Sequence, residues 1–325
     1  MSIFKNKTIL ITGGTGSFGK KFAEVLLTKH KPRKVIIYSR DELKQHDMQQ
    51  EFKEHKNIRF FIGDVRDKDR LMMAFHGVDF ILHAAALKQV PAMEYNPAEA
   101  IKTNTIGAMN IIDAAIERRI KKVIALSTDK ACNPINLYGA TKLCADKLFI
   151  AGNAYSGSAD TRFSVVRYGN VAGSRGSVVP FFARSIKEGV IPITDKRMTR
   201  FFITLDQAVD FVIKCFTIMH GGELFVPKIP SVKITELASI MGPDCKIKTI
   251  GIRPGEKLHE IMISEDDSRN TLEFRDYYIV KPSFPWWNDK NHNTGKKVPE
   301  GFQYSSNANR DWLGGNRLRK FLKLI

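Results

Sequence analysis

The chain has 325 residues, of which 43% are hydrophobic and 26% are charged. This balance predicts a globular protein that buries a full hydrophobic core in one large domain or two closely joined domains. The formal net charge at pH 7 is +17, because 51 Lys and Arg residues oppose 34 Asp and Glu residues. The basic residues are scattered and form no stripe or aromatic-interleaved arm, which argues against nucleic-acid binding. A lysine-rich surface, or attraction of anionic small molecules, accounts for the charge.

The chain shows no signature of export or of a membrane span. Its apolar stretches fall far short of the roughly 20 residues that cross a bilayer, and Met1 to Leu10 contains no signal-peptide pattern. Its four cysteines, at positions 132, 144, 215 and 245, have neither zinc-ligand spacing nor the density of a disulfide framework. We therefore expect a cytoplasmic protein with no membrane partner and no metal site.

The first half of the chain alternates short apolar runs with amphipathic segments, which predicts an α/β fold with a doubly wound parallel sheet. Strands are expected at Thr8–Thr12, Lys34–Tyr38, Ile58–Ile62, Phe80–His83, Lys122–Leu126 and Phe163–Tyr168, with helices beginning near Gly16, Glu42, Lys68, Pro97 and Leu137. We expect a Rossmann-type dinucleotide-binding domain at 1–168, completed by 201–228. A smaller C-terminal substrate-binding region is expected at 169–200 and 229–281, followed by a tail at 282–325. Ligands bind at the carboxyl ends of the strands in such a sheet.

The segment after the first strand matches the dinucleotide pattern G-x-G-x-x-G at Gly14, Gly16 and Gly19. Glycines there allow a tight turn and close approach of the backbone to a pyrophosphate, whose charge is favoured by the N-terminus of the next helix. A turn without a ligand is the alternative, which the strand–helix context disfavours. The predicted pyrophosphate loop comprises Gly13, Thr15, Gly16, Ser17, Phe18 and Gly19.

The end of the second strand predicts which nicotinamide dinucleotide is bound. NAD-specific proteins place an acidic residue there to bind the ribose hydroxyl. Here Ser39 and Arg40, with Lys44 one turn into the next helix, can hold a 2′-phosphate by charge-assisted hydrogen bonds. NADP is therefore preferred, although Asp41 beside these groups favours NAD and is included in the predicted cofactor site.

Two further strand ends complete the predicted cofactor site. After the third strand, Asp64 can accept a hydrogen bond from the adenine amino group, and Val65 can donate its amide. The alternative for Asp64 is a helix N-cap, where aspartate is common. After the fourth strand, Ala84 and Ala86 are small enough to let the dinucleotide lie against the sheet.

The fifth strand leads into a predicted catalytic group. It is followed by the sequence STDK at 127–130 and then by Tyr138 and Lys142. Tyr and Lys four residues apart lie on one face of a helix, so the ammonium of Lys142 can stabilise the phenolate of Tyr138 and make it a usable base. This spacing usually means an exposed pair, but its position after the fifth strand of a dinucleotide fold favours catalysis.

The glycine loop, the Ser-Thr pair and Y-x-x-x-K together resemble the extended short-chain dehydrogenase/reductase family. Longer blocks are similar to the inverting UDP-N-acetylglucosamine 4,6-dehydratases: YSRDELK at 38–44, STDKA at 127–131, NLYGATK at 136–142, RYGNV at 167–171, MTRFF at 198–202 and IRPGEK at 252–257. The similarity extends to about residue 278. It implies a lyase whose tightly bound NADP is regenerated in each turnover.

The resemblance implies a cycle in which Tyr138 takes the proton of the sugar 4-hydroxyl while NADP takes the hydride from carbon 4. Lys130 then removes the proton of carbon 5, Asp129 protonates the departing 6-hydroxyl, and the hydride returns to carbon 6. Inversion at carbon 5 gives UDP-2-acetamido-2,6-dideoxy-β-L-arabino-hex-4-ulose. A lysine is a useful base only if burial or a nearby cation lowers its pKa, so we expect such surroundings for Lys130. A surface ion pair is the alternative for Asp129 and Lys130. The implied catalytic group is Thr128, Asp129, Lys130, Tyr138 and Lys142.

The same resemblance implies the UDP-sugar contacts, namely Lys88, Thr128, Asn170, Val178, Val179, Thr194, Arg200, Arg253 and Glu256, and adds Val171 to the cofactor site. A solvated surface lysine is the alternative for Lys88. The product would feed synthesis of a modified sugar, such as pseudaminic acid or a capsular unit. Family members associate, so a homo-oligomer, either a dimer or a hexamer, is expected.

Two rival functions remain open. A nucleotide-sugar epimerase on the same scaffold would need no amine at Lys130. A non-catalytic regulator that senses the cofactor would belong to a class that typically lacks the Tyr/Lys pair.

Overall fold

The computed structural model describes residues 2–174, 176–323 and 325. Its main sheet has, among these residues, ten strands in the order β16-β14-β15-β10-β6-β5-β4-β1-β2-β3. The bounds are β1 Thr8–Thr12, β2 Lys34–Ser39, β3 Ile58–Ile62, β4 Phe80–His83, β5 Lys122–Thr128, β6 Arg162–Tyr168, β10 Leu224–Pro227, β14 Thr271–Glu273, β15 Tyr277–Val280 and β16 Lys296–Lys297. From β3 to β10 all neighbours are parallel, and the last three strands are antiparallel.

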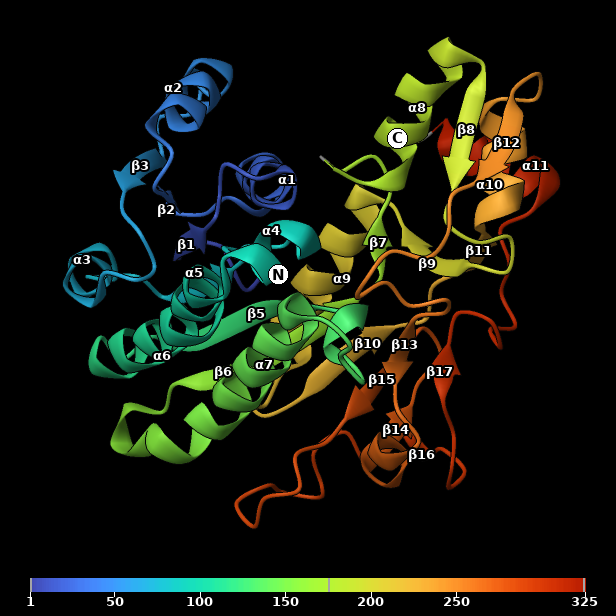
Figure 1. Ribbon diagram of the computed structural model, residues 1–325. Helices are drawn as coiled ribbons and strands as arrows, with labels where there is room; N and C mark the ends of the chain where they lie inside the picture. The colour runs from blue at the N-terminus through green and yellow to red at the C-terminus, as the bar shows by residue number, and fades with distance from the viewer. Residues whose placement is uncertain (1, 175, 324) are drawn as a thin grey trace.

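The predicted doubly wound sheet is confirmed. The predicted strands β1, β3 and β4 have their expected bounds, and β2, β5 and β6 are one or two residues longer. Helices cover both faces of the parallel part (Figure 1). They are α1 Ser17–Val25, α2 Glu42–Glu51, α3 Lys68–Ala74, α4 Val90–Tyr95, α5 Pro97–Ile101, α6 Gly107–Glu117, α7 Leu137–Tyr155 and α9 Leu205–Ile218. Helix α4 was not predicted, since its six residues are too few to show a period.

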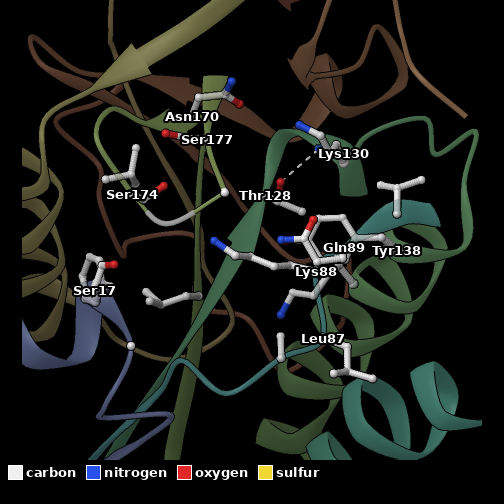
Figure 2. Close-up of a pocket in the computed structure, with 18 of the residues that line it drawn as sticks. Ser17, Leu87, Lys88, Gln89, Thr128, Lys130, Tyr138, Asn170, Ser174 and Ser177 are labelled. Carbon is white, nitrogen blue, oxygen red and sulfur yellow. Dashed lines mark hydrogen bonds between the residues drawn. The ribbon is translucent and has the colours of Figure 1, made fainter. Parts of the chain in front are cut away.

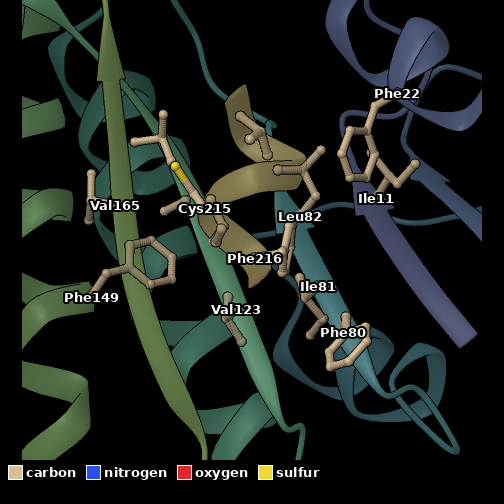
Figure 3. Packing of buried hydrophobic residues seen from close by; sticks show 14 of the residues in the cluster. Ile11, Phe22, Phe80, Ile81, Leu82, Val123, Phe149, Val165, Cys215 and Phe216 are labelled. Atoms are coloured by element: carbon tan, nitrogen blue, oxygen red, sulfur yellow. The ribbon is translucent and has the colours of Figure 1, made fainter. Parts of the chain in front are cut away.

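The core of the main sheet is apolar and aromatic. Figure 3 shows Phe22 of α1, Phe80 of β4 and Phe216 of α9 close together. The ring centroids of Phe80 and Phe216 are 6.1 Å apart, and those of Phe22 and Phe216 are 6.3 Å apart. Helix α9 begins with a capping box, in which Thr204 and Gln207 satisfy each other's backbone N–H groups. The apolar side chains of α9 cover one face of the sheet.

A second, smaller core lies at the carboxyl ends of the parallel strands. It is built from two small sheets, β7 Asn170–Val171 with β9 Thr199–Ile203 and β11 Ser231–Lys233, and β8 Val190–Ile193 with β12 Lys246–Thr249. Helices α8 Val178–Ser185, α10 Ile234–Met241 and α11 Gly315–Leu322 pack with them, at the upper right of Figure 1. A strand pair, β13 Ile261–Ile263 with β17 Tyr304–Ser305, lies below.

The predicted division into residue ranges stays a prediction, but two details differ from it. Strands β14 and β15 fall in the expected substrate region, yet they continue the main sheet, because β15 pairs with the free edge of β10. In the expected tail, Leu318 and Phe321 of α11 belong to the second core. Among the described residues, every helix is too short or too polar to cross a membrane.

Glu223, directly before β10, ties the tail to the main sheet. Its side chain is 0% exposed and accepts hydrogen bonds from Ser164 Oγ at 2.6 Å and from His292 Nε2 at 2.9 Å. It also accepts from the backbone N–H groups of His220 and Gly221. Burial opposes the charged form, but these hydrogen bonds outweigh it and hold the pKa of Glu223 below its usual value. One buried carboxylate therefore joins β6, β10 and the loop that carries His292.

We predict that Glu223→Gln lowers the free energy of unfolding by about 1–3 kcal/mol at neutral pH, because buried donors lose a charged acceptor. The folded-state pKa is depressed below 4.5, so this stabilisation is present above about pH 4.5 and is lost as the pH falls through the folded-state pKa. Urea denaturation of both proteins at neutral and at acidic pH measures the difference. A difference that grows on acidification would contradict the prediction.

Candidate active site

A cavity of about 900 Å³ opens where the parallel strands end, between the main sheet and the second core. Its lining includes the loops after β1, β2, β3, β4 and β5, the start of α7, and residues on both sides of β7. Figure 2 shows Thr128, Lys130 and Tyr138 on one side of it, and Asn170, Ser174 and Ser177 facing them. This is the location expected for ligands of a doubly wound sheet.

All six residues of the predicted pyrophosphate loop line this cavity. Gly13 has a φ of +65°, and a Cβ atom there would lie 2.8 Å from the backbone of Ala85. A Cβ atom on Gly19 would lie 2.5 Å from the Cα of Gly14. Both positions therefore require glycine, and the loop passes tightly between β1 and β4 before α1 begins at Ser17. The exposed N-terminus of α1 suits the negative charge of a pyrophosphate, so the loop fits a dinucleotide.

At the end of β2, Ser39, Arg40 and Lys44 line the cavity as predicted, and Thr15 Oγ1 lies 3.0 Å from Ser39 Oγ. Asp41 does not belong to the lining. It is the N-cap of α2, where its side chain accepts from the backbone N–H of Lys44 at 3.0 Å and pairs with the Lys44 ammonium. The carboxylate of Asp41, which we had included in the cofactor site, therefore caps helix α2 instead of facing the cavity.

After β3, Asp64 and Val65 line the cavity, as do Ala84, Ala86 and Val171. Arg66 binds Asp64 Oδ2 through Nε at 3.0 Å and Nη2 at 2.8 Å, and Arg40 Nη1 lies 3.4 Å from the same oxygen. The alternative that Asp64 caps a helix is wrong, because the N-cap of α3 is Asp67. An adenine would thus meet an aspartate that already has two arginines as partners.

The residues of the predicted catalytic group lie on two chain segments that pack directly against each other. After β5 the chain forms a short 3₁₀ turn, η3 (Asp129–Ala131), which lies against the first turn of α7. A Cβ atom on Gly139 would lie 2.1 Å from the carbonyl oxygen of Lys130, so only glycine permits this contact. Asn136 caps α7 by accepting from the N–H of Gly139 at 2.7 Å. Tyr138 and Lys130 are therefore held on adjoining segments.

Tyr138 differs electrostatically from the prediction. Burial raises the pKa of Tyr138 to about 12, against the lowering effects of the Lys130 ammonium and of a hydrogen bond with Thr128. We had expected Lys142 to supply that cation. Lys142 is 4% exposed, and burial lowers its pKa, with Asp146 one turn further along α7 opposing the shift. The cation that lowers the pKa of Tyr138 is Lys130, on the turn η3 that packs against α7.

The surroundings of Lys130 also differ from the prediction. Its Nζ lies 3.1 Å from Asp129 Oδ1 and 3.2 Å from Oε1 of Glu260, a residue that we had not predicted. Burial lowers the pKa of Lys130, but the two carboxylates outweigh burial and Arg200, and the net shift is upward. The alternative of a surface ion pair is wrong, because both carboxylates are 1% exposed.

Asp129 lies behind Thr128 and Lys130 and does not itself line the cavity. Its Oδ1 accepts from Thr128 Oγ1 at 3.0 Å, while Oδ2 is buried without a hydrogen-bond partner among the described residues. Burial raises the pKa of Asp129, which favours the protonated acid. A carboxyl group of this kind is suited to donate a proton.

Most predicted UDP-sugar contacts line the cavity: Lys88, Thr128, Asn170, Val178, Thr194, Arg200, Arg253 and Glu256. Figure 2 shows the side chain of Lys88 extending into the space. Val179 does not line the cavity and packs against the second core. Prediction also missed lining residues outside the matched blocks, among them Gln89, Ser174, Ser177, Phe181 and Glu260. Their signal was closeness to a predicted residue or block: Gln89 follows Lys88, while Ser174 and Glu260 lie three residues after the RYGNV and IRPGEK blocks.

Comparison with known proteins shows the family of this chain. The polysaccharide biosynthesis protein family matches residues 9–282. The chain belongs to this family. A relative from Campylobacter jejuni, UDP-N-acetylglucosamine 4,6-dehydratase (inverting), is 57% identical over 329 residues, covering 98% of each chain. A UDP-glucose 4-epimerase from Rickettsia conorii is 44% identical over 286 residues, covering 86% of this chain and 84% of the relative.

Solved structures agree on the fold of this family member, an extended short-chain dehydrogenase/reductase. Pen from Bacillus thuringiensis superposes with a TM-score of 0.92 at 38% identity, covering 99% of this chain and 100% of its own. The dTDP-glucose 4,6-dehydratase DesIV from Streptomyces venezuelae, solved with NAD bound, has a TM-score of 0.68 at 20% identity. It covers 77% of this chain and 86% of its own, and at that identity it shows the fold alone.

We predict that Gly139→Ala forces η3 away from α7, because the added methyl group would overlap the carbonyl of Lys130. The expected cost is about 1–3 kcal/mol of unfolding free energy, together with a loss of the site's activity. The matched control is Gly152→Ala on the same helix, where the new Cβ would meet only side chains, at 3.1 Å from Ile112 and 3.2 Å from Phe163. Thermal melting and turnover of both variants are the measurements. Equal effects of the two substitutions would contradict the prediction.

Proposed function

We propose that this protein is an NADP-dependent inverting UDP-N-acetylglucosamine 4,6-dehydratase. The observation that carries the proposal is the placement of Lys130 and the buried Asp129 near Tyr138, where β5 ends. The Campylobacter jejuni relative that bears this name is 57% identical over 98% of both chains, which supports the same activity here. The product would be UDP-2-acetamido-2,6-dideoxy-β-L-arabino-hex-4-ulose.

Each residue then has a distinct task. When bound in the glycine loop, the dinucleotide would supply reversible hydride acceptance and, in its oxidised form, a positive charge. Tyr138 takes the proton of the 4-hydroxyl, which requires its pKa to fall from the raised value that burial gives it. Lys130 takes the proton of carbon 5, and Asp129 donates one to the departing 6-hydroxyl. Lys142 and Thr128 orient the reacting groups.

The substrate would occupy the half of the cavity next to the second core. Arg253 and Arg200 suit the diphosphate, because guanidinium groups bind phosphate oxygens in a planar, two-pronged geometry. Asn170, Val178 and Thr194 complete the proposed nucleotide contacts, with Lys88 and Glu256 beside them. We also propose a cytoplasmic homo-oligomer that feeds synthesis of a modified sugar such as pseudaminic acid; the support for these points is the family resemblance alone.

A 4-epimerase is the second candidate function, and the 44% identity with the Rickettsia conorii relative favours it. An epimerase returns the hydride to carbon 4 and loses no water, so it has no use for a base and an acid at positions 130 and 129. The buried Asp129–Lys130 pair therefore favours the dehydratase. The retained Tyr/Lys pair likewise argues against a non-catalytic regulator.

Incubation of the purified protein with UDP-N-acetylglucosamine in D2O tests the proposal by mass spectrometry. We predict a product that has lost one water molecule and carries deuterium at carbon 5. Lys130→Ala should abolish both changes while leaving cofactor binding intact, because the proton acceptor for carbon 5 is removed. A product of unchanged mass would support the epimerase instead, and full dehydration by Lys130→Ala would exclude Lys130 as the base.

The cofactor proposal is tested by Arg40→Ala. Arg40 is 54% exposed in its side chain and lies at the end of β2, where it can bind a 2′-phosphate. We predict that the variant binds NADP at least tenfold more weakly, whereas its affinity for NAD changes little, as measured by calorimetric titration of the cofactor-stripped protein. Asp41→Asn is not a suitable control because it removes a helix cap, so Arg59→Ala, at an exposed position on β3, serves that purpose. An unchanged ratio of NADP to NAD affinity in Arg40→Ala would refute the assignment.

A further inference from the structure

We propose that Glu260 is a positioning residue for Lys130. Its carboxylate holds the Lys130 side chain in place and stabilises the positive charge that forms on Lys130 as the amine takes the proton of carbon 5. This inference rests on the proposed dehydratase function of the site, and it adds a second acidic residue to Asp129 and Lys130 of the STDK motif.

The backbone around Glu260 is held firmly from outside the motif. Glu260 lies directly before β13, and its N–H donates to Ser306 Oγ at 2.9 Å while its carbonyl accepts from the N–H of Ser306 at 2.8 Å. Ser306 follows β17, the partner strand of β13. The side chain of Glu260 is 1% exposed, so its position is set by the strand pair and not by solvent.

The carboxylate of Glu260 lies between two cations. Its Oε1 is 3.2 Å from Lys130 Nζ and 3.7 Å from Arg200 Nε, and its Oε2 is buried without a hydrogen-bond partner among the described residues. Arg200 is itself fixed, because it donates to the carbonyl of Thr199 at 2.7 Å and to that of Lys257 at 2.9 Å. Glu260 thus connects a permanently charged arginine to the amine of Lys130.

Other ionisable groups face the same amine. Asp129 on η3 is 3.1 Å away, Tyr138 on α7 is within electrostatic reach, and Lys257 adds positive charge from the loop before β13. Burial opposes ionisation of Glu260, but Lys130 and Arg200 outweigh it and hold the pKa of Glu260 below its usual value. Glu260 therefore stays ionised, whereas burial raises the pKa of Asp129.

These charges determine where one proton can lie. With Glu260 ionised and Arg200 charged, the group of four is neutral only if Asp129 and Lys130 share a single proton. On Lys130 that proton gives the ammonium–carboxylate pair. Transfer from Lys130 Nζ to Asp129 Oδ1, across 3.1 Å, gives a neutral amine and a carboxylic acid without any change in net charge. That second form is the one that elimination requires.

The elimination step then balances. The electrons of the C5–H bond form the C5–C6 double bond as Lys130 takes the proton, and the C6–O bond breaks as Asp129 protonates the leaving oxygen, which departs as water. Lys130 is again an ammonium and Asp129 again a carboxylate. Positive charge therefore develops on Lys130, 3.2 Å from an ionised carboxylate in a site of low exposure, where a preorganised opposite charge is most effective. The carboxylate behind the histidine of a serine protease stabilises an imidazolium in the same way.

The test is Glu260→Gln, which keeps the shape of the side chain and removes its charge. The measurement is the rate of deuterium incorporation at carbon 5 as a function of pH, together with the KM for UDP-N-acetylglucosamine. Loss of the carboxylate lowers the pKa of Lys130, so we expect the inflection of the pH–rate profile to move to lower pH. The plateau rate should fall on the order of 10²-fold, and KM should change little.

Two variants serve as controls. Glu260→Asp keeps the charge and should retain the wild-type inflection at a reduced rate. Glu223→Gln removes another buried carboxylate, outside the cavity, and should lower stability without moving the inflection. If Glu260→Gln fails to fold, the rate of the folded fraction of Glu260→Asp decides the question, because that rate is reduced if Glu260 positions Lys130 and equals the wild-type rate if Glu260 is purely structural.

An inflection at the wild-type pH in Glu260→Gln, with only a lower amplitude, would overturn the proposal and leave Glu260 as a structural counter-ion of Arg200. Failure of the proposed function looks different, because the wild-type protein would then show neither water loss nor exchange at carbon 5. The two failures are therefore distinguishable in one set of experiments.

Discussion

The contact between the carbonyl of Lys130 and the backbone of Gly139 is the constraint on which the site depends. No side chain fits at Gly139, since a Cβ atom there would lie 2.1 Å from the Lys130 carbonyl oxygen. This contact places the turn after β5 against the first turn of α7, so that residues eight positions apart, Lys130 and Tyr138, act in one electrostatic environment. Strand β5 leads into η3, and helix α7 carries Tyr138. The two segments can pack together only because Gly139 has no side chain.

A second consequence concerns the charges that gather around this contact. Lys130, Asp129, Glu260 and Arg200 form a group of two cations and two anions, drawn from η3, β9 and the loop before β13, in which all members but the half-buried Lys130 are buried. Ion pairs removed from water are costly unless the charges compensate one another closely. Here two positive charges balance two negative charges, so a proton can move from Lys130 to Asp129 without separating charge. The same arrangement accounts for the opposite pKa shifts of Asp129 and Glu260.

The part of the cavity proposed to bind the cofactor depends mainly on local backbone geometry. Glycine and alanine residues after β1 and β4 let the backbone approach a ligand, and the N-terminus of α1 faces the same space. Sequence alone predicted the glycine loop, because a strand–turn–helix unit is local and its glycine spacing reflects backbone geometry directly. The strand positions were predictable for a related reason, since continuous apolar runs mark strands buried on both faces.

Prediction failed where a side chain's neighbours come from distant parts of the chain. The pKa of Lys130 is raised instead of lowered, because Glu260, 130 positions further along the chain, lies 3.2 Å from its Nζ. Similarly, β14 and β15 extend the main sheet because β10 offers a free edge, which no local pattern reveals. Asp41 is a different case, since it caps α2 through Lys44, only three residues away.

The sequence by itself determined the doubly wound sheet and predicted the dinucleotide loop and the candidate catalytic residues, since each depends on residues close together in the chain. Only the tertiary structure decided the protonation of those groups. The charge state of a buried amine depends on which carboxylates surround it at about 3 Å, and that is a property of packing between elements, not of the order of residues.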